Sequence, residues 1–538
     1  MIHRLSPPSQ PVVLITGAGD GIGRALARIC RTRGARVVGV GRRARELVPP
    51  GLCDDYCRVD LAQPFAAAII ADALRQRGIE RLDLLIHCAG IGAYGAVDDQ
   101  SSAEIEALLN VNLRAPITLT YALLPLLAAA RGRVVMIGSV VAALPAPNYA
   151  VYGATKAALE GFVRSLRAEL RGVVEVQVVH PGATRTSMHA TSGVPLDRIE
   201  WQRFPSPEKT AAGIVDAIDR GASVATVGAT NRLLRFAGRY AGRVADIVAA
   251  RSIVPPSRVA LNHHSPVSGA TRHCVVTGGA HGIGQAVVEQ YARAGWSITI
   301  IDRDATQAAR LCRALCNSGV VATFIEADLA QPLCIDRVVH QLAALPPASV
   351  VVHSAGINAV GAFAAIPLDV QQAVLDVNLR APLLLTAGLL RNELLAPHAA
   401  LVFIASLSVY TGYPGAAVYA ATKEGLAAYA RSLRVALASR SIHVATVYPG
   451  PTRTAHARRY SPDNRREQRR MPPERVAQSI LAAVEQRRAE VIPGMSNRLI
   501  AAASRVAPAL ATYAMRKAII EQLPQPETWF GPDGEAQR

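Results

Sequence analysis

Two tyrosine–lysine pairs have the spacing of a proton-transfer site. Tyr152 precedes Lys156 by four residues, and Tyr419 precedes Lys423 by the same number. On a helix, side chains four residues apart lie on one face, one turn from each other. Free tyrosine has a pKa of about 10, and a cation beside it favours the phenolate and lowers that value. Each tyrosine is therefore a candidate general acid or base, although the same spacing also occurs on ordinary helix surfaces.

A serine stands 13 residues before each of these tyrosines. Ser139 follows the apolar sequence RVVMIG, and Ser406 follows LVFIA. A serine at the end of a strand can hydrogen-bond a substrate oxygen, and it can equally serve as a simple cap. Ser408 is a rival to Ser406, but the 13-residue spacing favours Ser406.

Glycine-rich turns occur near the start of each half of the chain. Thr16–Gly23 reads TGAGDGIG and Thr277–Gly284 reads TGGAHGIG, each between an apolar run and an amphipathic segment. Glycine permits a tight turn and lets backbone amides approach a phosphate at the positive end of the next helix. One such turn is weak support, since turns use glycine anyway. Two predict dinucleotide binding at Thr16, Gly17, Gly21, Ile22 and Gly23, and at Gly278, Gly282, Ile283 and Gly284.

The residue 24 positions after the first glycine differs between the two halves. It is Gly41 in the first half, followed by Arg42 and Arg43, and Asp302 in the second. A carboxylate there accepts hydrogen bonds from the adenosine ribose and repels a 2′-phosphate, which predicts NAD(H) for the second half. Gly41 leaves room and Arg42 supplies a cation, which predicts NADP(H) for the first half. Asp20 in the turn works against a nearby phosphate, and a solvated loop is the alternative for Arg42.

Two aspartates are further candidates on the adenine side. Asp60 and Asp328 each precede a leucine after the predicted third strand. A carboxylate at this place can hydrogen-bond the adenine, and a helix N-cap is the competing interpretation.

These candidates need a scaffold, and short apolar runs alternating with amphipathic segments predict one. The runs in the first half are Val12–Thr16, Arg36–Val40, Leu82–His87, Arg133–Ile137 and Val174–Val179. Continuous apolar strands between helices indicate a parallel sheet covered on both faces. The expected fold is α/β, a doubly wound, Rossmann-like parallel sheet.

The same order of motifs occurs twice, which predicts two domains. HCAG at residue 87 returns as HSAG at 353, and NVNLRAP at 110 returns as DVNLRAP at 376. Gly278 follows Gly17 by 261 residues and Gly450 follows Gly182 by 268, so the copies differ by small insertions. A duplication of this length is a repeated domain and not a solenoid. We expect domains at residues 1–254 and 273–538, joined by a linker at 255–272.

With both pairs in register with the glycine turns, the chain resembles the short-chain dehydrogenase/reductase family, in tandem and over nearly its whole length. The resemblance implies the catalytic sets Asn112, Ser139, Tyr152 and Lys156, and Asn378, Ser406, Tyr419 and Lys423. It implies cofactor contacts at Ala89, Gly90, Pro181, Gly182 and Thr184, and at Ala355, Gly356, Pro449, Gly450 and Thr452. The family's Asn-Asn-Ala-Gly is here His87-Cys-Ala-Gly90 and His353-Ser-Ala-Gly356, a departure on the sheet and adenine side that leaves catalysis intact.

The resemblance implies interconversion of secondary alcohols and ketones at two sites. With different cofactors, one site could oxidise an alcohol and the other reduce the ketone, which would invert a carbinol. One copy acting only as a cofactor-binding scaffold or redox sensor is the alternative. The segment 187–207 suggests a hydrophobic substrate for the first domain. The arginines of 453–475 suggest an anionic, coenzyme A-linked or carrier-linked substrate for the second, or a solvated flap.

Composition excludes several classes of protein. Hydrophobic residues make up 50% of the 538 and charged residues 18%, which excludes a disordered chain. The net charge of +18 comes from scattered arginines and not from a basic arm, so nucleic-acid binding rests on charge alone and is not expected. Only four of the 58 basic residues are lysines, namely Lys156, Lys209, Lys423 and Lys517.

Cysteine spacing and hydropathy bear on compartment and partners. The eight cysteines form no Cys-x2-Cys pair, so free thiols in a reducing cytoplasm are expected, with no metal site. The apolar stretch Ile117–Ala130 is too short to span a bilayer, which takes about 20 residues. We therefore expect a cytoplasmic protein whose domains form an intramolecular pseudo-dimer, with a homo-oligomer as the alternative or additional assembly.

Overall fold

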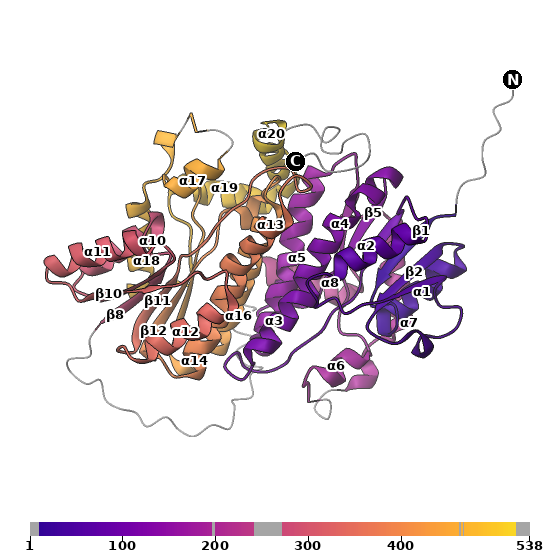
Figure 1. The fold of residues 1–538 in the computed structure, drawn as a ribbon, viewed down its shortest axis with the longest axis horizontal. Helices are drawn as coiled ribbons and strands as arrows, with labels where there is room; N and C mark the ends of the chain where they lie inside the picture. Colours follow the sequence, from indigo (N-terminus) through magenta and orange to yellow (C-terminus); the bar gives the residue numbers. More distant parts are fainter. Residues whose placement is uncertain (1–9, 196–199, 241–271, 462–463, 466, 523–538) are drawn as a thin grey trace.

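The computed structural model describes residues 10–195, 200–240, 272–461, 464–465 and 467–522, and it contains two parallel sheets (Figure 1). Their strand orders are β3-β2-β1-β4-β5-β6-β7 and β10-β9-β8-β11-β12-β13-β14. This confirms the predicted doubly wound α/β fold in both halves. The predicted linker, residues 255–272, lies outside the described residues except for Arg272.

The first sheet takes its strands from the apolar runs expected to form them. Its strands are β1 (Val12–Thr16), β2 (Arg36–Gly41), β3 (Asp55–Arg58), β4 (Leu84–His87), β5 (Arg133–Ile137), β6 (Glu175–His180) and β7 (Val224–Thr226). The main helices are α1 (Gly21–Thr32), α2 (Ala66–Gln76), α3 (Ser102–Leu109), α4 (Ala115–Ala130), α5 (Ala150–Glu169), α6 (Ser187–Thr191), α7 (Pro207–Asp219) and α8 (Ala229–Tyr240). Leu14 packs in one buried cluster and its neighbours Val13 and Ile15 in another, so both faces of the sheet are covered.

The second half repeats this arrangement. Its strands are β8 (His273–Thr277), β9 (Ser297–Asp302), β10 (Ala322–Glu326), β11 (Ala348–His353), β12 (Leu395–Ile404), β13 (His443–Val447) and β14 (Glu490–Val491). The helices are α10 (Gly282–Arg293), α11 (Ala305–Asn317), α12 (Pro332–Ala343), α13 (Leu368–Leu375), α14 (Ala381–Arg391), α15 (Ser408–Thr411), α16 (Ala417–Ala436), α17 (Ala455–Tyr460), α18 (Pro473–Glu485), α19 (Met495–Val506) and α20 (Pro508–Ile519).

The strand order places the candidate residues at the edge of each sheet that is formed by the carboxyl ends of its strands. Chain direction across the sheet reverses between β1 and β4, and between β8 and β11. In doubly wound sheets, ligands bind beyond the carboxyl ends of the strands at this reversal. The glycine-rich turn follows β1, and Ser139 follows β5, so both lie at that edge.

The helical segment that holds the apolar stretch Ile117–Ala130 is longer than the sequence indicated, and the second half contains a similar one. A π-helical turn, Asn110–Arg114, joins α3 to α4, and Asp376–Arg380 joins α13 to α14 in the same way. The joined helices, Ser102–Ala130 and Leu368–Arg391, are long and apolar enough to cross a membrane by length and composition. Their most apolar windows are 56% and 89% buried inside the fold, as core helices are.

The two halves pack through α5 and α16, which lie side by side at the centre of the molecule (Figure 1). Glycine allows this close approach. A Cβ on Gly161 would lie 2.9 Å from the carbonyl oxygen of Ala420, and one on Gly425 would lie 3.0 Å from that of Ala154. Both candidate tyrosines therefore stand on helices of the contact between the two domains.

Candidate active sites

The structure brings the four candidate catalytic residues of the first domain together. Tyr152 and Lys156 lie on α5 and are 8% and 5% exposed, with the lysine Nζ 5.8 Å from the tyrosine ring centre. The Ser139 hydroxyl hydrogen-bonds Tyr152. Asn112 sits in the π-helical turn, where its Oδ1 accepts from the Ile91 amide at 2.9 Å. A Cβ on Gly90 would lie 3.3 Å from Asn112 Oδ1 and 3.4 Å from Lys156 Nζ, so both line one small space.

The second domain repeats this geometry. Lys423 Nζ lies 5.7 Å from the Tyr419 ring centre and donates to the carbonyl oxygen of Ile404 at 2.9 Å. Asn378 Oδ1 accepts from the Ile357 amide at 2.8 Å. The hydroxyl that hydrogen-bonds Tyr419 belongs to Ser406 and not to its rival Ser408.

Burial sets the pKa of these groups more strongly than their charged neighbours do. Desolvation raises the pKa of Tyr152 above its ordinary value and that of Tyr419 to about 12, while the serine hydrogen bonds lower them. It lowers the pKa of Lys156 and of Lys423 to about 8. We expected the lysine to lower the tyrosine pKa. The net shift in the structure is upward, because the buried phenolate loses its hydration.

Lys156→Met is expected to stabilise the first domain near neutral pH. Burial lowers the pKa of Lys156 from 10.5 to about 8, so below pH 8 the folded protein holds a buried charge that the unfolded chain hydrates. This shift corresponds to about 3 kcal/mol. Loss of the Lys156 hydrogen bond to the Ile137 carbonyl oxygen subtracts roughly 1 kcal/mol. The free energy of unfolding should therefore rise by about 2 kcal/mol.

The gain should depend on pH with a defined sign. Between pH 8 and 10.5 the unfolded chain holds the proton and the folded protein does not, so wild-type stability rises across this window and the advantage of the variant shrinks. Urea unfolding measured near both ends of this window tests the expectation. Lys209→Met is the control, because Lys209 is exposed and should give no gain. An equal gain at both pH values would contradict the assignment to Lys156.

The glycine-rich turns have the close backbone contacts that a dinucleotide cradle needs. Gly17 has a φ of +72°, and a Cβ there would lie 2.9 Å from Ala89 Cα. Gly278 has a φ of +66°, and a Cβ there would lie 2.7 Å from Ala355 Cα. Helices α1 and α10 begin within these turns, at Gly21 and Gly282, so their N-termini lie at the carboxyl ends of the strands. In the first domain the Gly21 amide donates to Asp20 Oδ1 at 2.7 Å. The turns therefore fit the diphosphate of a dinucleotide.

The adenosine ends of the two domains differ. Asp302 Oδ2 accepts from the Ala280 amide at 3.0 Å, which fixes the carboxylate beside the second turn. In the first domain the hydroxyl of Tyr56, on β3, fills this place. It lies 2.7 Å from where a Cβ on Gly41 would be and 3.6 Å from one on Gly19. Sequence reasoning missed Tyr56, because β3 follows β2 through an irregular segment whose length cannot be judged in advance.

The remaining adenine-side candidates make local contacts. Arg42 is exposed, and its neighbour Arg43 pairs with Asp20 at 2.7 Å. Asp60 accepts from the Ala62 amide and Asp328 from the Ala330 amide, both at 3.0 Å. These bonds close small turns ahead of α2 and α12, so neither aspartate is a helix N-cap.

The Pro-Gly-Thr segments are supported by two asparagines that sequence reasoning missed. A Cβ on Gly182 would lie 2.6 Å from Asn231 Oδ1, and one on Gly450 would lie 2.6 Å from Asn497 Cγ. Pro181 precedes the first of these glycines and Pro449 the second. The hydroxyl of Thr184 donates to the Gly182 carbonyl oxygen at 3.1 Å, and that of Thr452 to the Gly450 carbonyl oxygen at 3.0 Å. Recurrence of the tripeptide Asn-Arg-Leu at 231 and 497 was the available signal.

A buried ionic cluster positions Ser139 in the first domain alone. His180 Nδ1 lies 3.2 Å from the Ser139 amide nitrogen, and its Nε2 lies 3.5 Å from Glu160. Arg235 of α8 pairs with Glu160 at 3.0 Å and is 7% exposed. In the second domain, Tyr448 and Ala427 pack together in an apolar cluster at the positions of His180 and Glu160. The sequence could not show this cluster because its members are scattered along the chain.

The departures from the family motif belong to the cores of the domains. His87 Nε2 bonds the Thr120 hydroxyl at 2.9 Å, and His353 Nε2 bonds the Thr386 hydroxyl at 3.1 Å. Both histidines are buried, and desolvation lowers the pKa of each to about 3. They are therefore neutral members of the core that link the central sheet to α4 and α14.

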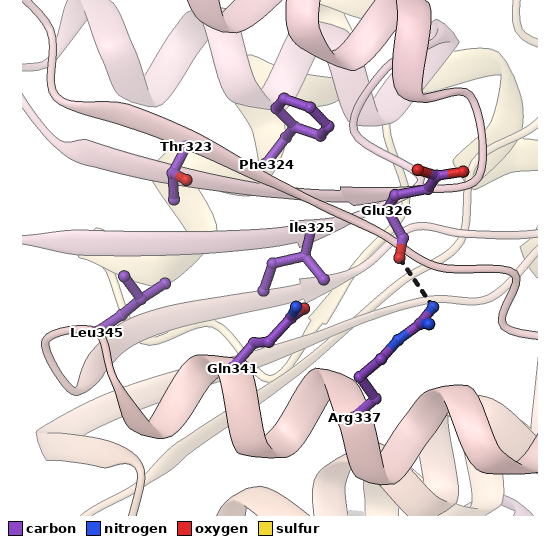
Figure 2. Close-up of a pocket in the computed structure, with 7 residues that line it drawn as sticks. All are labelled: Thr323, Phe324, Ile325, Glu326, Arg337, Gln341 and Leu345. Carbon is purple, nitrogen blue, oxygen red and sulfur yellow. Dashed lines mark hydrogen bonds between the residues drawn. The ribbon is translucent and has the colours of Figure 1, made fainter.

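A cavity of about 540 Å³ lies away from these sites, between the edge strand β10 and α12 (Figure 2). Arg337 of α12 donates to the carbonyl oxygen of Glu326 at 3.2 Å across it. Strands β9, β8 and β11 separate β10 from β12, after which Ser406 follows. Distance in the sheet excludes this cavity as the place of the tyrosine chemistry.

Comparison with known proteins agrees with the site geometry. The family model described as short chain dehydrogenase matches residues 11–194 and 272–465. Dehydrogenase/reductase SDR family member 7B of Bos taurus is 37% identical over 192 residues, 33% of this chain and 59% of that protein. The putative oxidoreductase SadH of Mycobacterium tuberculosis is 30% identical over 252 residues, 43% of this chain and 91% of that protein.

A short-chain dehydrogenase structure from Streptomyces avermitilis is 28% identical, with a TM-score of 0.39, over 46% of this chain and 97% of that one. The chain spans 59% of the length of the bovine relative. Two separate matches to one family model, one in each half, agree with the two sheets and the two glycine-rich turns. The chain therefore belongs to the short-chain dehydrogenase family, the NAD(P)-dependent oxidoreductases, once in each half.

Proposed function

We propose that each half is a complete enzyme that interconverts a secondary alcohol and a ketone. The observation that carries the proposal is the repeated cluster, in which a buried tyrosine is hydrogen-bonded to a serine and flanked by a lysine and an asparagine. The bound nicotinamide would supply or accept the hydride. A scaffold or sensor domain would not need this cluster, and both halves have it.

The four clustered side chains of each domain transfer the proton and bind the substrate oxygen. In reduction, the neutral Tyr152 or Tyr419 donates its proton to the oxygen of the substrate as negative charge develops there. Ser139 or Ser406 hydrogen-bonds that oxygen. The tyrosine is then reprotonated from the solvent side, where the lysine and the asparagine line one space beside Gly90 or Gly356. The raised tyrosine pKa keeps the proton available at neutral pH.

The test is substitution of each tyrosine in the full chain. Tyr152→Phe and Tyr419→Phe are each assayed with NADH and NADPH over a panel of ketones and alcohols. Loss of a different part of the activity in each variant would support two independent sites.

We propose NADP(H) for the first domain and NAD(H) for the second. The turn fits the diphosphate in both, and the distinction lies at the adenosine end. Asp302 presents a fixed carboxylate that would repel a 2′-phosphate. Tyr56 presents a neutral hydroxyl in the corresponding place, with Arg45 5.9 Å from its ring centre. Arg303 follows Arg42 by the same 261 residues that separate the turns, so Arg42 alone does not make the difference.

Asp302→Ala is expected to admit NADPH to the second domain. Removing a like charge beside the 2′-phosphate should tighten NADPH binding at least about tenfold, since such repulsion costs several kcal/mol. Titration of NADPH fluorescence should then give two sites per chain, where the wild type gives one tight site. The control is Asp336→Ala, on α12 away from the turn. An unchanged number of NADPH sites would contradict the role of Asp302.

The loops beside the sites suggest different substrates. Trp201 packs edge-on against His189 and Phe204 in the first domain, with ring centres 5.0 and 5.6 Å apart. This aromatic group favours a hydrophobic substrate. In the second domain the charge of Arg470 acts on Tyr413, whose ring packs 5.9 Å from that of Tyr419. A cation that acts on this neighbour of Tyr419 favours an anionic, coenzyme A-linked or carrier-linked substrate.

The two sites could then act in sequence on one carbinol, with oxidation at one and reduction at the other. Two cofactors of different redox poise would drive the inversion. The proposed setting is the cytoplasm, where both cofactors and free thiols occur; the eight cysteines are all unpaired in the structure.

A further inference from the structure

Each domain holds the active-site wall of the other. In the second domain, this wall includes the segment between Ser406 and Tyr419. The last two turns of α5, in the first domain, contact this segment. There Arg164 donates a hydrogen bond to the Val409 carbonyl oxygen. The Ser165 hydroxyl accepts from the Tyr413 amide at 3.0 Å. The ring of Tyr413 packs on the ring of Tyr419. One side chain therefore connects the contact between the domains to the proposed catalytic tyrosine.

The same contact occurs in the opposite direction. Ser432 follows Ser165 by 267 residues, as Tyr419 follows Tyr152. Its hydroxyl accepts from the Ala146 amide at 3.2 Å, in the segment between Ser139 and Tyr152. Arg431 donates to the Ala142 carbonyl oxygen at 3.4 Å. The contacts are therefore reciprocal, with each serine serving the site of the other domain.

The contacts between the two domains are not reciprocal at Glu169. It is the last residue of α5 and is fully buried, and its carboxylate accepts from the Gly415 amide at 3.1 Å and from the Phe363 amide. A negative charge at the C-terminal end of a helix is unfavourable, and burial raises the pKa of this carboxyl to about 7. The corresponding residue of the second domain is Ala436, which has no acceptor in its side chain.

Glu169 joins two segments that flank Tyr419. Gly415 lies just before α16, and Phe363 lies in the loop that follows β11. The Gly361 amide donates to the Gly415 carbonyl oxygen at 2.9 Å, so the two segments already touch. Glu169, Phe363 and Tyr419 line one small cavity. Glu169 therefore places a buried carboxylate at the C-terminal end of a helix, where its charge is unfavourable. Both of its oxygens accept hydrogen bonds from backbone amides of the other domain.

We propose that Glu169 is a positioning residue for the Tyr419 site, supplied by the first domain. Ser165 and Ser432 are the reciprocal pair that positions the two walls. The second site thus depends on the first domain more than the first site depends on the second. The inference rests on the proposed role of Tyr419 for its kinetic readout only.

A crossed experiment in the full chain tests this. Ser165→Ala, Glu169→Ala and Ser432→Ala are each made in two backgrounds, Tyr152→Phe to report the second site and Tyr419→Phe to report the first. Hydrogen–deuterium exchange is followed in the segments 359–366 and 409–416 and in the segment 142–148. Ser165→Ala removes a single oxygen, so the proposal can still be tested with this variant if Glu169→Ala does not fold.

Glu169→Ala and Ser165→Ala should speed exchange in 359–366 or 409–416 about tenfold, the effect of losing one buried hydrogen bond. They should lower kcat at the second site by a similar factor, with the KM for the cofactor unchanged. Exchange in 142–148 and turnover at the first site should not change. Ser432→Ala, the matched control, should give the reverse pattern.

Two results would overturn the inference. One is unchanged exchange in the facing segments, and the other is an equal response of both domains to each variant, which indicates general destabilisation. Failure of the proposed function is recognised separately. Turnover that survives in Tyr419→Phe combined with Tyr152→Phe would remove the tyrosine mechanism, while the exchange data would still decide whether Glu169 and the serines hold the walls.

Discussion

Tyr152→Phe should abolish turnover at the first site and leave the second intact, and Tyr419→Phe should do the converse. Loss of a general acid that protonates the substrate oxygen lowers kcat by about 10²–10⁴-fold. The ring is retained, so the packing of these buried residues is preserved and only the hydroxyl bonded to Ser139 or Ser406 disappears. The measurement is NADPH and NADH turnover on the ketone panel, with cofactor binding by fluorescence expected to be unchanged.

The chain offers a matched control three residues away. Tyr149 packs with its ring centre 5.8 Å from that of Tyr152, and burial raises its pKa to about 12. Its hydroxyl has no proposed part in proton transfer, so Tyr149→Phe should keep kcat within about threefold, the range of a modest change in packing. If Tyr152→Phe behaved like Tyr149→Phe, the first domain would be a cofactor-binding scaffold. The same result for Tyr419→Phe would indicate that the second domain is a cofactor-binding scaffold.

The pattern of the sequence was sufficient for the fold and for candidate residues that the structure brings together in each half. Apolar runs between amphipathic segments predicted the sheets, and the 13-residue interval from Ser406 to Tyr419 selected the serine that hydrogen-bonds this tyrosine. This information is local, because a strand, a turn and one helix supply the serine, the tyrosine and the lysine of each cluster. Asn112 and Asn378 are the exception within the cluster, and the family resemblance supplied them.

What the sequence could not supply depends on contacts between distant segments. The direction of the tyrosine pKa shift follows from burial, which is a property of the finished fold. Tyr56 takes the place of a carboxylate because β3 lies beside Gly39 and Gly41 in the sheet. Glu169 reaches Gly415 across 246 residues. No spacing rule predicts such a contact, since it exists only after the two domains have packed through α5 and α16.

The cofactor assignment has a second test with a large expected effect, at the last glycine of each turn. A Cβ on Gly23 would overlap the carbonyl oxygen of Gly17 and lie 2.7 Å from its carbonyl carbon. A Cβ on Gly284 would meet Gly278 in the same way. Neither Gly23 nor Gly284 has a positive φ, so space and not backbone conformation requires the glycine. The methyl group must push the helix away from the turn that holds the diphosphate.

Gly23→Ala should therefore weaken cofactor binding at the first domain about 10–100-fold, since overpacking of this kind costs 1–3 kcal/mol. Binding at the second domain should be unaffected, and Gly284→Ala should give the converse. The control is Gly153→Ala, because a Cβ there meets Val141 at an ordinary 3.4 Å and the second copy carries Ala420 at this position. NADPH and NADH fluorescence titrations measure the two sites separately. If Gly23→Ala weakened binding of both cofactors equally, the domains would not bind their dinucleotides independently, and the assignment of one cofactor to each would fail.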